Sequence, residues 1–269
     1  MRVRLGLLRE QIRAILTESP ASNAFEKHVA SAVKAALSGT GAKIEHAGSS
    51  EYSDIRIDIP GIGSSFLEVK LTSGDNLGNP RLQYDGNQWI VAGDSGSPLA
   101  AYAVEFMNES PEAQAFINDL KAFLKTDTVR LQGKKPGSVT LPQIKAFLAK
   151  RPNKNIAELD SVDAAALATQ HYAVAKKEPA HYVQAGDDFY LMGSADPLDL
   201  NLVNDGQIPV LRGMGRLAVR IADRSARYEV QVSVKMWKHD PSPFSAMLPT
   251  SKVNPFTALA KSLKARKRG

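Results

Sequence analysis

The chain has 269 residues, of which 43% are apolar, and its formal net charge is +6 at neutral pH. The absence of cysteine excludes disulfides, thiolate metal sites and cysteine nucleophiles. The longest apolar runs fall short of the roughly eighteen residues that a membrane helix needs, and residues 1–17 are amphipathic without the pattern of an export signal. We therefore expect a cytoplasmic protein without membrane contact.

The positive charge is concentrated at the C-terminal end. No Asp or Glu lies between 252 and 269, and the six basic residues there equal the whole net charge of +6. A basic tail can contact phosphates, but it is equally compatible with an ordinary solubilising end. The bulk charge thus permits a nucleic-acid partner without requiring one.

The first quarter of the chain is predicted to contain two helices followed by three strands. Apolar residues recur at helical spacing over 3–17 and 22–37. The period then changes to two, which predicts strands over 43–46, 54–59 and 66–71, the last two joined by a turn rich in Gly and Pro.

The middle of the chain is predicted to be mainly helical. Residues 73–87 are rich in Gly, Asn and Asp and are typical of a long loop. Strands are predicted over 88–92 and 101–106, before a helix that Ser110 caps and Pro111 begins. Two further helices are predicted over 142–149 and 162–175, and four strands over 181–185, 189–192, 216–221 and 227–236.

These elements predict an α/β protein with four consecutive parts. Residues 1–108 form an α/β core, and 109–178 form a helical segment. Residues 179–240 form a β-rich segment that is a candidate for target recognition, and 241–269 form a Pro-containing basic tail.

The strand over 66–71 carries the residues with the clearest chemistry. Alternation places Glu68 and Lys70 on one face and the apolar residues on the other. In the preceding strand, Asp54 lies on the corresponding face if the two strands pair with their apolar faces together. Asp58 shares that face and would replace Asp54 if the pairing slipped by two residues.

Two acids and a lysine suit metal-dependent hydrolysis of a phosphodiester. The carboxylates of Asp54 and Glu68 and the carbonyl of Val69 are oxygen ligands of the kind that Mg²⁺ prefers. Lys70 could orient or deprotonate the attacking water and offset developing negative charge.

At these residues the chain resembles the PD-(D/E)xK nuclease superfamily. Ser53-Asp54 stands where the family often has Pro-Asp, and Glu68-Val69-Lys70 lies on the next strand. Glu26, in the preceding helix, matches an upstream acid common in that family. The resemblance covers about residues 20–106 and implies a restriction-endonuclease-like core, in which helices flank a four-stranded mixed sheet. It also implies a Mg²⁺ cofactor and a DNA substrate.

Each of these features also has a plain structural explanation. Alternating Glu and Lys is common on a solvated strand face. Glu26 near the start of a helix can serve the helix dipole alone. Both alternatives stay open at the level of sequence.

Further basic and polar residues are candidates for DNA contact. Arg81 and Gln83 follow the catalytic strand in the predicted loop. Arg216, Arg220 and Arg227 belong to a basic hairpin whose size fits a DNA groove, although a charged outer face explains it equally well.

We therefore expect a Mg²⁺-dependent DNA endonuclease of restriction, phage or mobile-element type acting on double-stranded DNA. The alternatives are a structure-specific repair or recombination nuclease and a non-catalytic nucleic-acid-binding protein. Cleavage of both strands favours a homodimer with two active sites.

Overall fold

The computed structural model describes most of the chain as a mixed α/β protein made of two compact units. The first unit comprises residues 1–75, 168–212 and 239–269, and the second comprises 76–167 and 213–238. The helix predicted over 3–17 lies outside the described residues. These are 20–46, 53–71, 76–84, 88–92, 97–124, 141–150, 155–159, 161–176, 178–224, 227–247 and 251–266.

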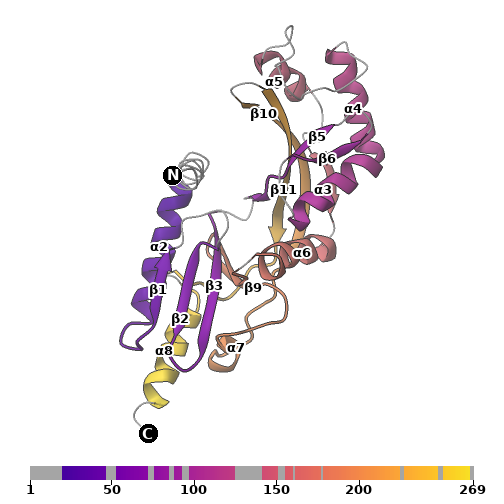
Figure 1. The fold of residues 1–269 in the computed structure, drawn as a ribbon. Coiled ribbons are helices and arrows are strands. Elements are labelled where there is room, and N and C mark those ends of the chain that lie inside the picture. Colours follow the sequence, from indigo (N-terminus) through magenta and orange to yellow (C-terminus); the bar gives the residue numbers. More distant parts are fainter. Residues whose placement is uncertain are drawn as a thin grey trace, which may run out of the picture. The chain divides into compact units, whose positions relative to one another are not determined.

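A five-strand mixed sheet is the framework of the first unit (Figure 1). Its strands are β1 (Lys43–His46), β2 (Ile55–Ile59), β3 (Gly63–Lys70), β8 (Ala180–Ala185) and β9 (Asp188–Leu191). They lie in the order β1-β2-β3-β8-β9. The first three pair antiparallel, β8 runs parallel to β3, and β9 returns antiparallel to β8. The predicted α/β class with a mixed sheet is therefore confirmed, but the sheet has five strands where the resemblance implies four.

The hairpin of β2 and β3 has the predicted register because both strands bury one apolar face. Ile55 lies opposite Leu67, and Ile59 lies opposite Gly63. The connecting turn places Gly61 at φ 80°, a conformation that favours glycine. The shared burial of isoleucine and leucine thus fixes which residues face each other at the far end of the hairpin.

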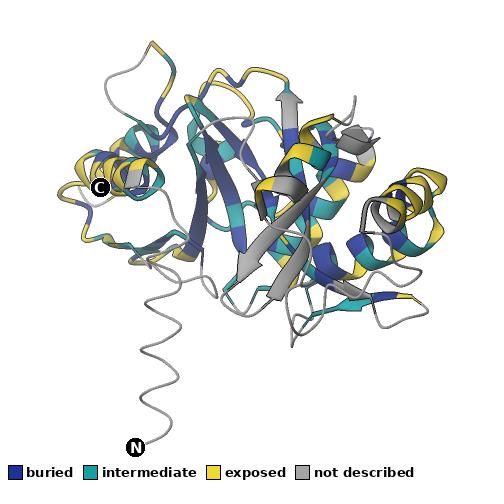
Figure 2. Ribbon diagram, turned by 90° about the horizontal axis from the view of Figure 1, so that it is seen from above, coloured by how far each residue is buried: buried dark blue, intermediate teal, exposed yellow. Residues whose placement is uncertain are grey.

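Three helices cover the apolar face of this sheet. Helix α2 (Pro20–Ala36) packs on β1 and β3, and α8 (Pro255–Arg266) packs on α2 and on the short α7 (Leu200–Val203). Figure 2 shows the strands mostly buried and the outer side of α8 exposed. None of the described helices is long and apolar enough to cross a membrane. The core includes Val29, Val33, Ile55, Ile57, Leu67, Tyr182, Phe189, Phe256 and Leu259.

The predicted basic tail contains a helix that belongs to the core. The Asn254 side chain accepts hydrogen bonds from the N–H groups of Phe256 and Thr257 at 3.0 and 3.1 Å, which caps the start of α8. Phe256 and Leu259 are fully buried, while the basic residues of α8 lie on its outer side. The sequence analysis emphasised the charge and missed the apolar spacing.

Removing the Phe256 ring should destabilise the first unit strongly. We expect Phe256→Ala to cost about 3–5 kcal/mol, because its ring fills the core between Phe189 and the other helices. The exposed Lys261→Ala on the same helix should change stability by less than about 0.5 kcal/mol. Urea unfolding followed by circular dichroism measures both. Similar midpoints for the two variants would contradict the packing of α8.

A second sheet organises the other unit. It has six strands in the order β6-β5-β11-β10-β7, with β4 also paired to β11. Its helices are α3 (Pro98–Glu109), α4 (Pro111–Leu124), α5 (Leu141–Lys150) and α6 (Ser161–Thr169), and η1 (Gln170–Val174), a π-helical turn, continues α6 into the first unit. The strands are β4 (Asn76–Gly78), β5 (Arg81–Tyr84), β6 (Trp89–Val91), β7 (Asn155–Leu159), β10 (Gly213–Arg224) and β11 (Arg227–His239).

Three predicted elements in the second unit were wrong or missing. The strand predicted over 101–106 is part of α3, because Ser97 caps the helix, Pro98 begins it, and its buried residues follow helical spacing. The loop predicted over 73–87 contains β4 and β5, which pair with the distant β11. Strand β7 was not predicted. Its partner β10 is likewise far away in sequence, so no local pattern reveals it.

The domain boundaries expected at 108, 178 and 240 differ from the observed units. Each unit is built from separate stretches of chain. The physical reason is the pairing of β3 with β8, which joins residues before 75 to residues after 179 in one sheet.

Candidate functional site

The two candidate carboxylates face each other at one end of the β2–β3 hairpin. Asp54 immediately precedes β2, and continuing the register from Ile55 and Leu67 places it opposite Glu68. An oxygen of Asp54 accepts a hydrogen bond of 2.6 Å from the Val69 N–H. Glu68 is buried, with only 4% of its surface exposed. The structure thus brings Asp54 and Glu68 together as the alternation predicts.

Two ammonium groups hold the buried Glu68 carboxylate. Lys70 Nζ lies 2.8 Å from Oε1, and Lys176 Nζ lies 3.0 Å from Oε2. Lys70 occupies the same strand face, as predicted. Lys176 follows η1 and was missed, because nothing in the local pattern links it to a strand 108 positions earlier.

A tyrosine ring forms one wall of this cluster. Tyr172 in η1 is 3% exposed, and its ring centroid lies 5.3 Å from Lys70 Nζ and 4.7 Å from Lys176 Nζ. Such distances allow cation–π attraction. The continuation of α6 into η1 therefore places one aromatic side chain against both ammonium groups.

Glu26 lies near this cluster but is bonded to another partner. It is 6% exposed on α2, and its Oε2 lies 3.0 Å from Nε2 of His46 at the end of β1. The charge of Glu26 also contributes to raising the pKa of Asp54. The predicted helical acid is thus brought near the predicted aspartate. His46, which the sequence analysis did not select, is its immediate partner.

The pKa values of the two carboxylates are shifted in opposite directions. Burial and the nearby Glu68 carboxylate raise the pKa of Asp54 well above its usual range. Burial alone would raise the pKa of Glu68, but the ammonium groups of Lys70 and Lys176 outweigh it and lower that pKa. Burial opposes the charge of Lys70 as well, yet Glu68 raises its pKa. Lys70 and the Val69 N–H lower the pKa of Asp54 but do not outweigh its burial, so Asp54 is the less compensated acid of the pair.

His171 adds an uncharged group beside the lysines. Burial, together with the positive charge of Lys176, lowers its pKa to about 4. Its Nδ1 is buried without a hydrogen-bond partner among the described residues. The ring is therefore neutral at physiological pH and adds no third positive charge to the cluster.

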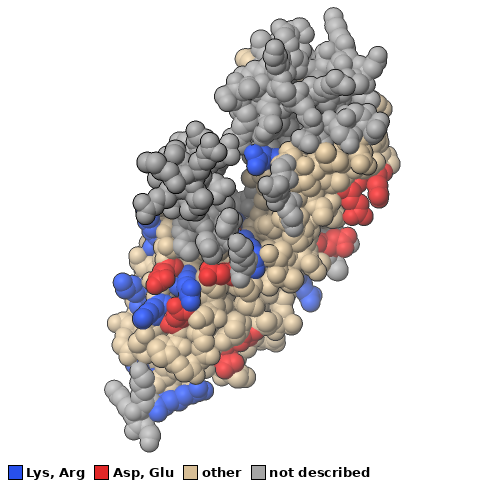
Figure 3. All heavy atoms as spheres, viewed as in Figure 1, with Lys and Arg blue, Asp and Glu red and all other residues tan. Residues whose placement is uncertain are grey.

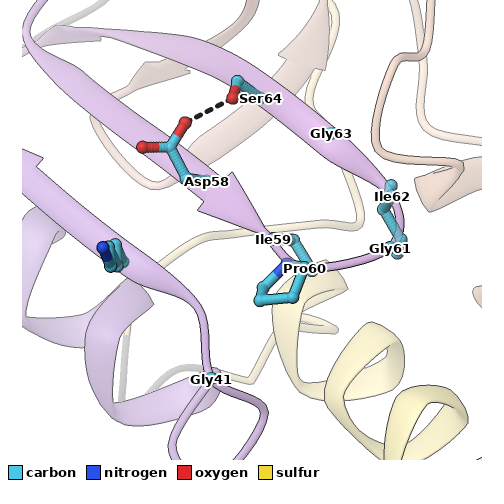
Figure 4. A pocket seen from close by; sticks show the side chains of 9 residues that line it. Gly41, Asp58, Ile59, Pro60, Gly61, Ile62, Gly63 and Ser64 are labelled. Carbon is cyan, nitrogen blue, oxygen red and sulfur yellow. Dashed lines mark hydrogen bonds between the residues drawn. The ribbon is translucent and has the colours of Figure 1, made fainter.

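Asp58 does not substitute for Asp54. It lies at the other end of β2, opposite Ser64. Its carboxylate accepts a hydrogen bond from Ser64 (Figure 4) and another from Arg56 Nε. These contacts lower its pKa, with Ser64 as the largest cause. The register therefore selects Asp54 as the partner of Glu68.

The ligands available to a metal ion are two carboxylates and a main-chain carbonyl. Within the described parts of the chain, no group of three or more His, Asp or Glu side chains is arranged to hold a metal. Val69 donates its N–H toward Asp54, and the N–H and C=O of one strand residue point to the same side. Its carbonyl is thus directed toward the same edge. Hard oxygen donors and an incompletely compensated carboxylate fit a divalent cation.

The predicted DNA-contacting residues belong to the second unit, whereas the carboxylates belong to the first. Arg81 and Gln83 lie in β5 and not in a loop after the catalytic strand, so that part of the prediction was wrong. Arg216 and Arg220 lie in β10, and Arg227 begins β11. Arg81 and Arg216 are partly buried, and the side chains of the other three lie outside the described residues.

Two surface hollows among the described residues of the first unit lie away from the carboxylates. One, of about 480 Å³, is lined by Gly41, Lys43 and residues 58–64 at the opposite end of the hairpin (Figure 4). Another, of about 660 Å³, lies between α7 and α8. Acidic and basic side chains lie side by side on the face of this unit in Figure 3. Neither hollow adds a charged cluster comparable to that around Glu68.

No protein-family model, curated protein or solved structure matches this chain. The functional argument therefore rests on the geometry around Asp54 and Glu68.

Neutralising Asp54 should stabilise the metal-free protein. The folded chain binds the Asp54 proton more tightly than the unfolded chain, so ionisation costs stability above the raised pKa. We expect Asp54→Asn to raise Tm at neutral pH by about 2–4 °C, corresponding to about 1 kcal/mol. The gain should vanish as the pH falls toward 3.8, the ordinary aspartate value. Calorimetry over a pH series tests this, and a gain independent of pH would contradict it.

Neutralising Glu68 should have the opposite effect. Glu68→Gln leaves two largely buried ammonium groups without their carboxylate, which we expect to cost about 3–5 kcal/mol in urea unfolding. The exposed Glu45→Gln on β1 is the matched control, with an expected change below about 0.5 kcal/mol. Equal effects at the two positions would show that the charges around Glu68 are screened by solvent.

Proposed function

We propose that this chain is a Mg²⁺-dependent DNA endonuclease related to the PD-(D/E)xK nucleases. The observation that carries the proposal is the placement of Asp54 opposite Glu68, with Lys70 bonded to the same Glu68. These three residues carry the sequence resemblance. They come together in space through an antiparallel hairpin whose register excludes the alternative aspartate.

The surrounding fold supports this proposal. The resemblance implies a mixed sheet flanked by helices, and the first unit has a mixed sheet in which β3 is a central strand. Glu26, the helical acid of the resemblance, is close enough to influence the pKa of Asp54. Active sites are where unfavourable charge is commonly concentrated, and the raised pKa of Asp54 is consistent with that pattern.

The catalytic roles follow from the charges of the side chains. Asp54, Glu68 and the Val69 carbonyl would hold Mg²⁺, which supplies Lewis-acid activation of water and of the phosphate. The raised pKa of Lys70 keeps its ammonium charged. Lys70 is therefore better suited to orient water and to offset negative charge in the transition state than to remove a proton.

The second unit is our candidate for DNA recognition. Arg216 and Arg220 on β10 and Arg227 on β11 belong to a long hairpin, and two-stranded ribbons can enter a major groove. An inserted unit of this size exceeds what hydrolysis alone needs, which favours a restriction, phage or mobile-element enzyme over a minimal repair nuclease. Action on both strands of DNA favours a homodimer.

A non-catalytic nucleic-acid-binding protein is the competing explanation. In that case Glu68 and Lys70 were expected to form an exposed ion pair. Instead, only 5% of the Glu68 side chain and 21% of the Lys70 side chain are exposed. Burying such charges costs several kcal/mol unless they are well paired. Glu68 and Lys70 are buried and well paired, and the cost of burial falls on the neighbouring Asp54, which favours a functional cluster over a solvated strand face.

The decisive experiment is plasmid cleavage with and without Mg²⁺. We expect nicked and linear products only with the metal, and at least about a 100-fold loss of rate in Asp54→Ala, Glu68→Ala and Lys70→Ala. All three substitutions should slow cleavage, because the three side chains act together on one phosphate.

Asp58→Asn provides the matched control for this experiment. Asp58 lies on the same strand as the site but bonds Ser64 and Arg56 instead. Its substitution should leave the rate within about threefold of the parent, because it has no contact with the reacting groups. Cleavage that survives in Asp54→Ala and Lys70→Ala would overturn the proposed function.

A further inference from the structure

We propose that Lys176 is a built-in competitor for the metal. Its ammonium group occupies Glu68 Oε2 when the metal is absent, leaves when the metal binds, and then contacts a DNA phosphate. This inference rests on the proposed nuclease function. It assigns Lys176 a role that the aspartate and Glu-x-Lys pattern does not include.

The first argument is that both oxygens of Glu68 are already occupied. Lys70 takes Oε1 at 2.8 Å and Lys176 takes Oε2 at 3.0 Å. A cation that uses Glu68 as a ligand needs one of these oxygens. Because Glu68 is 4% exposed, the carboxylate has little room to turn toward a new partner. Each carboxylate oxygen has two lone pairs, but a divalent cation on an oxygen that already bonds an ammonium group would lie close to a like charge. This repulsion favours movement of one ammonium group away from its oxygen.

The backbone indicates which lysine moves. Lys70 lies on β3 two residues from Glu68 and points to the same strand face, so its position is tied to that of the carboxylate. Lys176 follows the end of η1, next to the exposed Val174 and Ala175. Its side chain is 13% exposed against 21% for Lys70, so the distinction between the two lysines rests on the backbone that carries them. Lys176 is thus the lysine that can leave while the sheet stays intact.

The Tyr172 ring lowers the cost of this movement. Lys176 Nζ lies 4.7 Å from the ring centroid, so it has a second attractive partner besides Glu68. An ammonium group that leaves Glu68 can keep contact with the ring face. Tyr172 therefore keeps Lys176 near the site when the carboxylate is taken by the metal.

The charge balance favours movement of Lys176 from Glu68 toward a DNA phosphate. With both acids ionised, Asp54 and Glu68 balance Lys70 and Lys176, so adding a divalent cation leaves two excess positive charges. Each phosphate of the DNA backbone carries one negative charge. Lys176 released from Glu68 can pair with that phosphate, which couples metal binding to DNA binding.

Mn²⁺ binding measured by electron paramagnetic resonance tests the competition without DNA or turnover. In Lys176→Met, which keeps an unbranched apolar side chain against Tyr172, we expect the Kd for Mn²⁺ to fall roughly tenfold. Lys34→Met removes the same charge from an exposed position of α2 and should leave the Kd unchanged. Circular dichroism establishes that each variant is folded, and Lys176→Gln replaces Lys176→Met if the latter is not.

Cleavage kinetics add a second readout with a distinctive pattern. In Lys176→Met the Mg²⁺ concentration for half-maximal rate should fall, whereas the rate at saturating Mg²⁺ should fall at least tenfold. A role limited to stability does not combine tighter metal binding with slower turnover.

The outcomes separate the two proposals. An unchanged Mn²⁺ Kd in Lys176→Met, with binding intact in the parent protein, overturns the competition and leaves the nuclease proposal standing. Mn²⁺ binding to neither the parent nor Lys176→Met overturns the metal site, and this inference with it. Tighter binding in Lys176→Met but not in Lys34→Met supports the competition, and a saturated cleavage rate equal to that of the parent overturns the phosphate contact.

Discussion

The parallel pairing of β3 with β8 is the constraint on which the first unit depends. It joins Glu68 to Val183 and Lys70 to Ala185 across more than a hundred residues of chain. Lys70 also accepts a hydrogen bond from the Gly186 N–H at 2.8 Å through its main-chain carbonyl. Because β8 follows η1 directly in the chain, this pairing also carries Tyr172 and Lys176 to the carboxylates.

The two carboxylates of the charged cluster are compensated to different extents. Glu68 is compensated by two lysines, whereas Asp54 has the Val69 N–H and a weaker influence from Lys70. A core selected for stability alone would not place a second carboxylate beside Glu68. The neighbouring core of Ile55, Ile57 and Leu67 offsets this cost through burial of apolar surface. The charged cluster and the apolar core thus occupy opposite faces of the same two strands.

The predictions that held were those in which a local pattern and a local partner coincide. Ile55, Ile57 and Ile59 alternate with polar residues, and their turn is short, so the sequence contains both the strand and its register. That was enough to predict that Asp54, Glu68 and Lys70 share one end of a hairpin. The helix that bears Glu26 was predicted for the same reason, from apolar spacing alone.

The strand predicted over 101–106 was wrong although the Ser97 cap and Pro98 that begin α3 are local, but most other failures arose where the partner is far away in sequence. Lys176 and Tyr172 acquire their roles from β3, and no periodicity in residues 162–176 indicates this. β4 and β5 were hidden by Gly and Asn: β4 pairs with the distant β11, and β5 lies between β11 and the nearby β6. His46 becomes notable only because β1 brings it to Glu26. Tertiary pairing therefore overrode composition at each of these positions.

The interruption of the first unit by the second has a consequence for the order in which the chain folds. On emerging from the ribosome, residues up to 75 can form α2 and the first three strands, but β8, β9 and α8 are still to be synthesised. Until they arrive, β3 is an unpaired edge with an apolar face. The second unit is interrupted in the same way, because the chain passes through residues 168–212 of the first unit before β10 and β11 are made. Non-local pairing of this kind slows folding and lengthens the time for which aggregation-prone strand edges are exposed. Asp54 and Glu68 can thus come together early in the β2–β3 hairpin, whereas Tyr172 and Lys176 join them only after the second unit's residues 76–167 have been made.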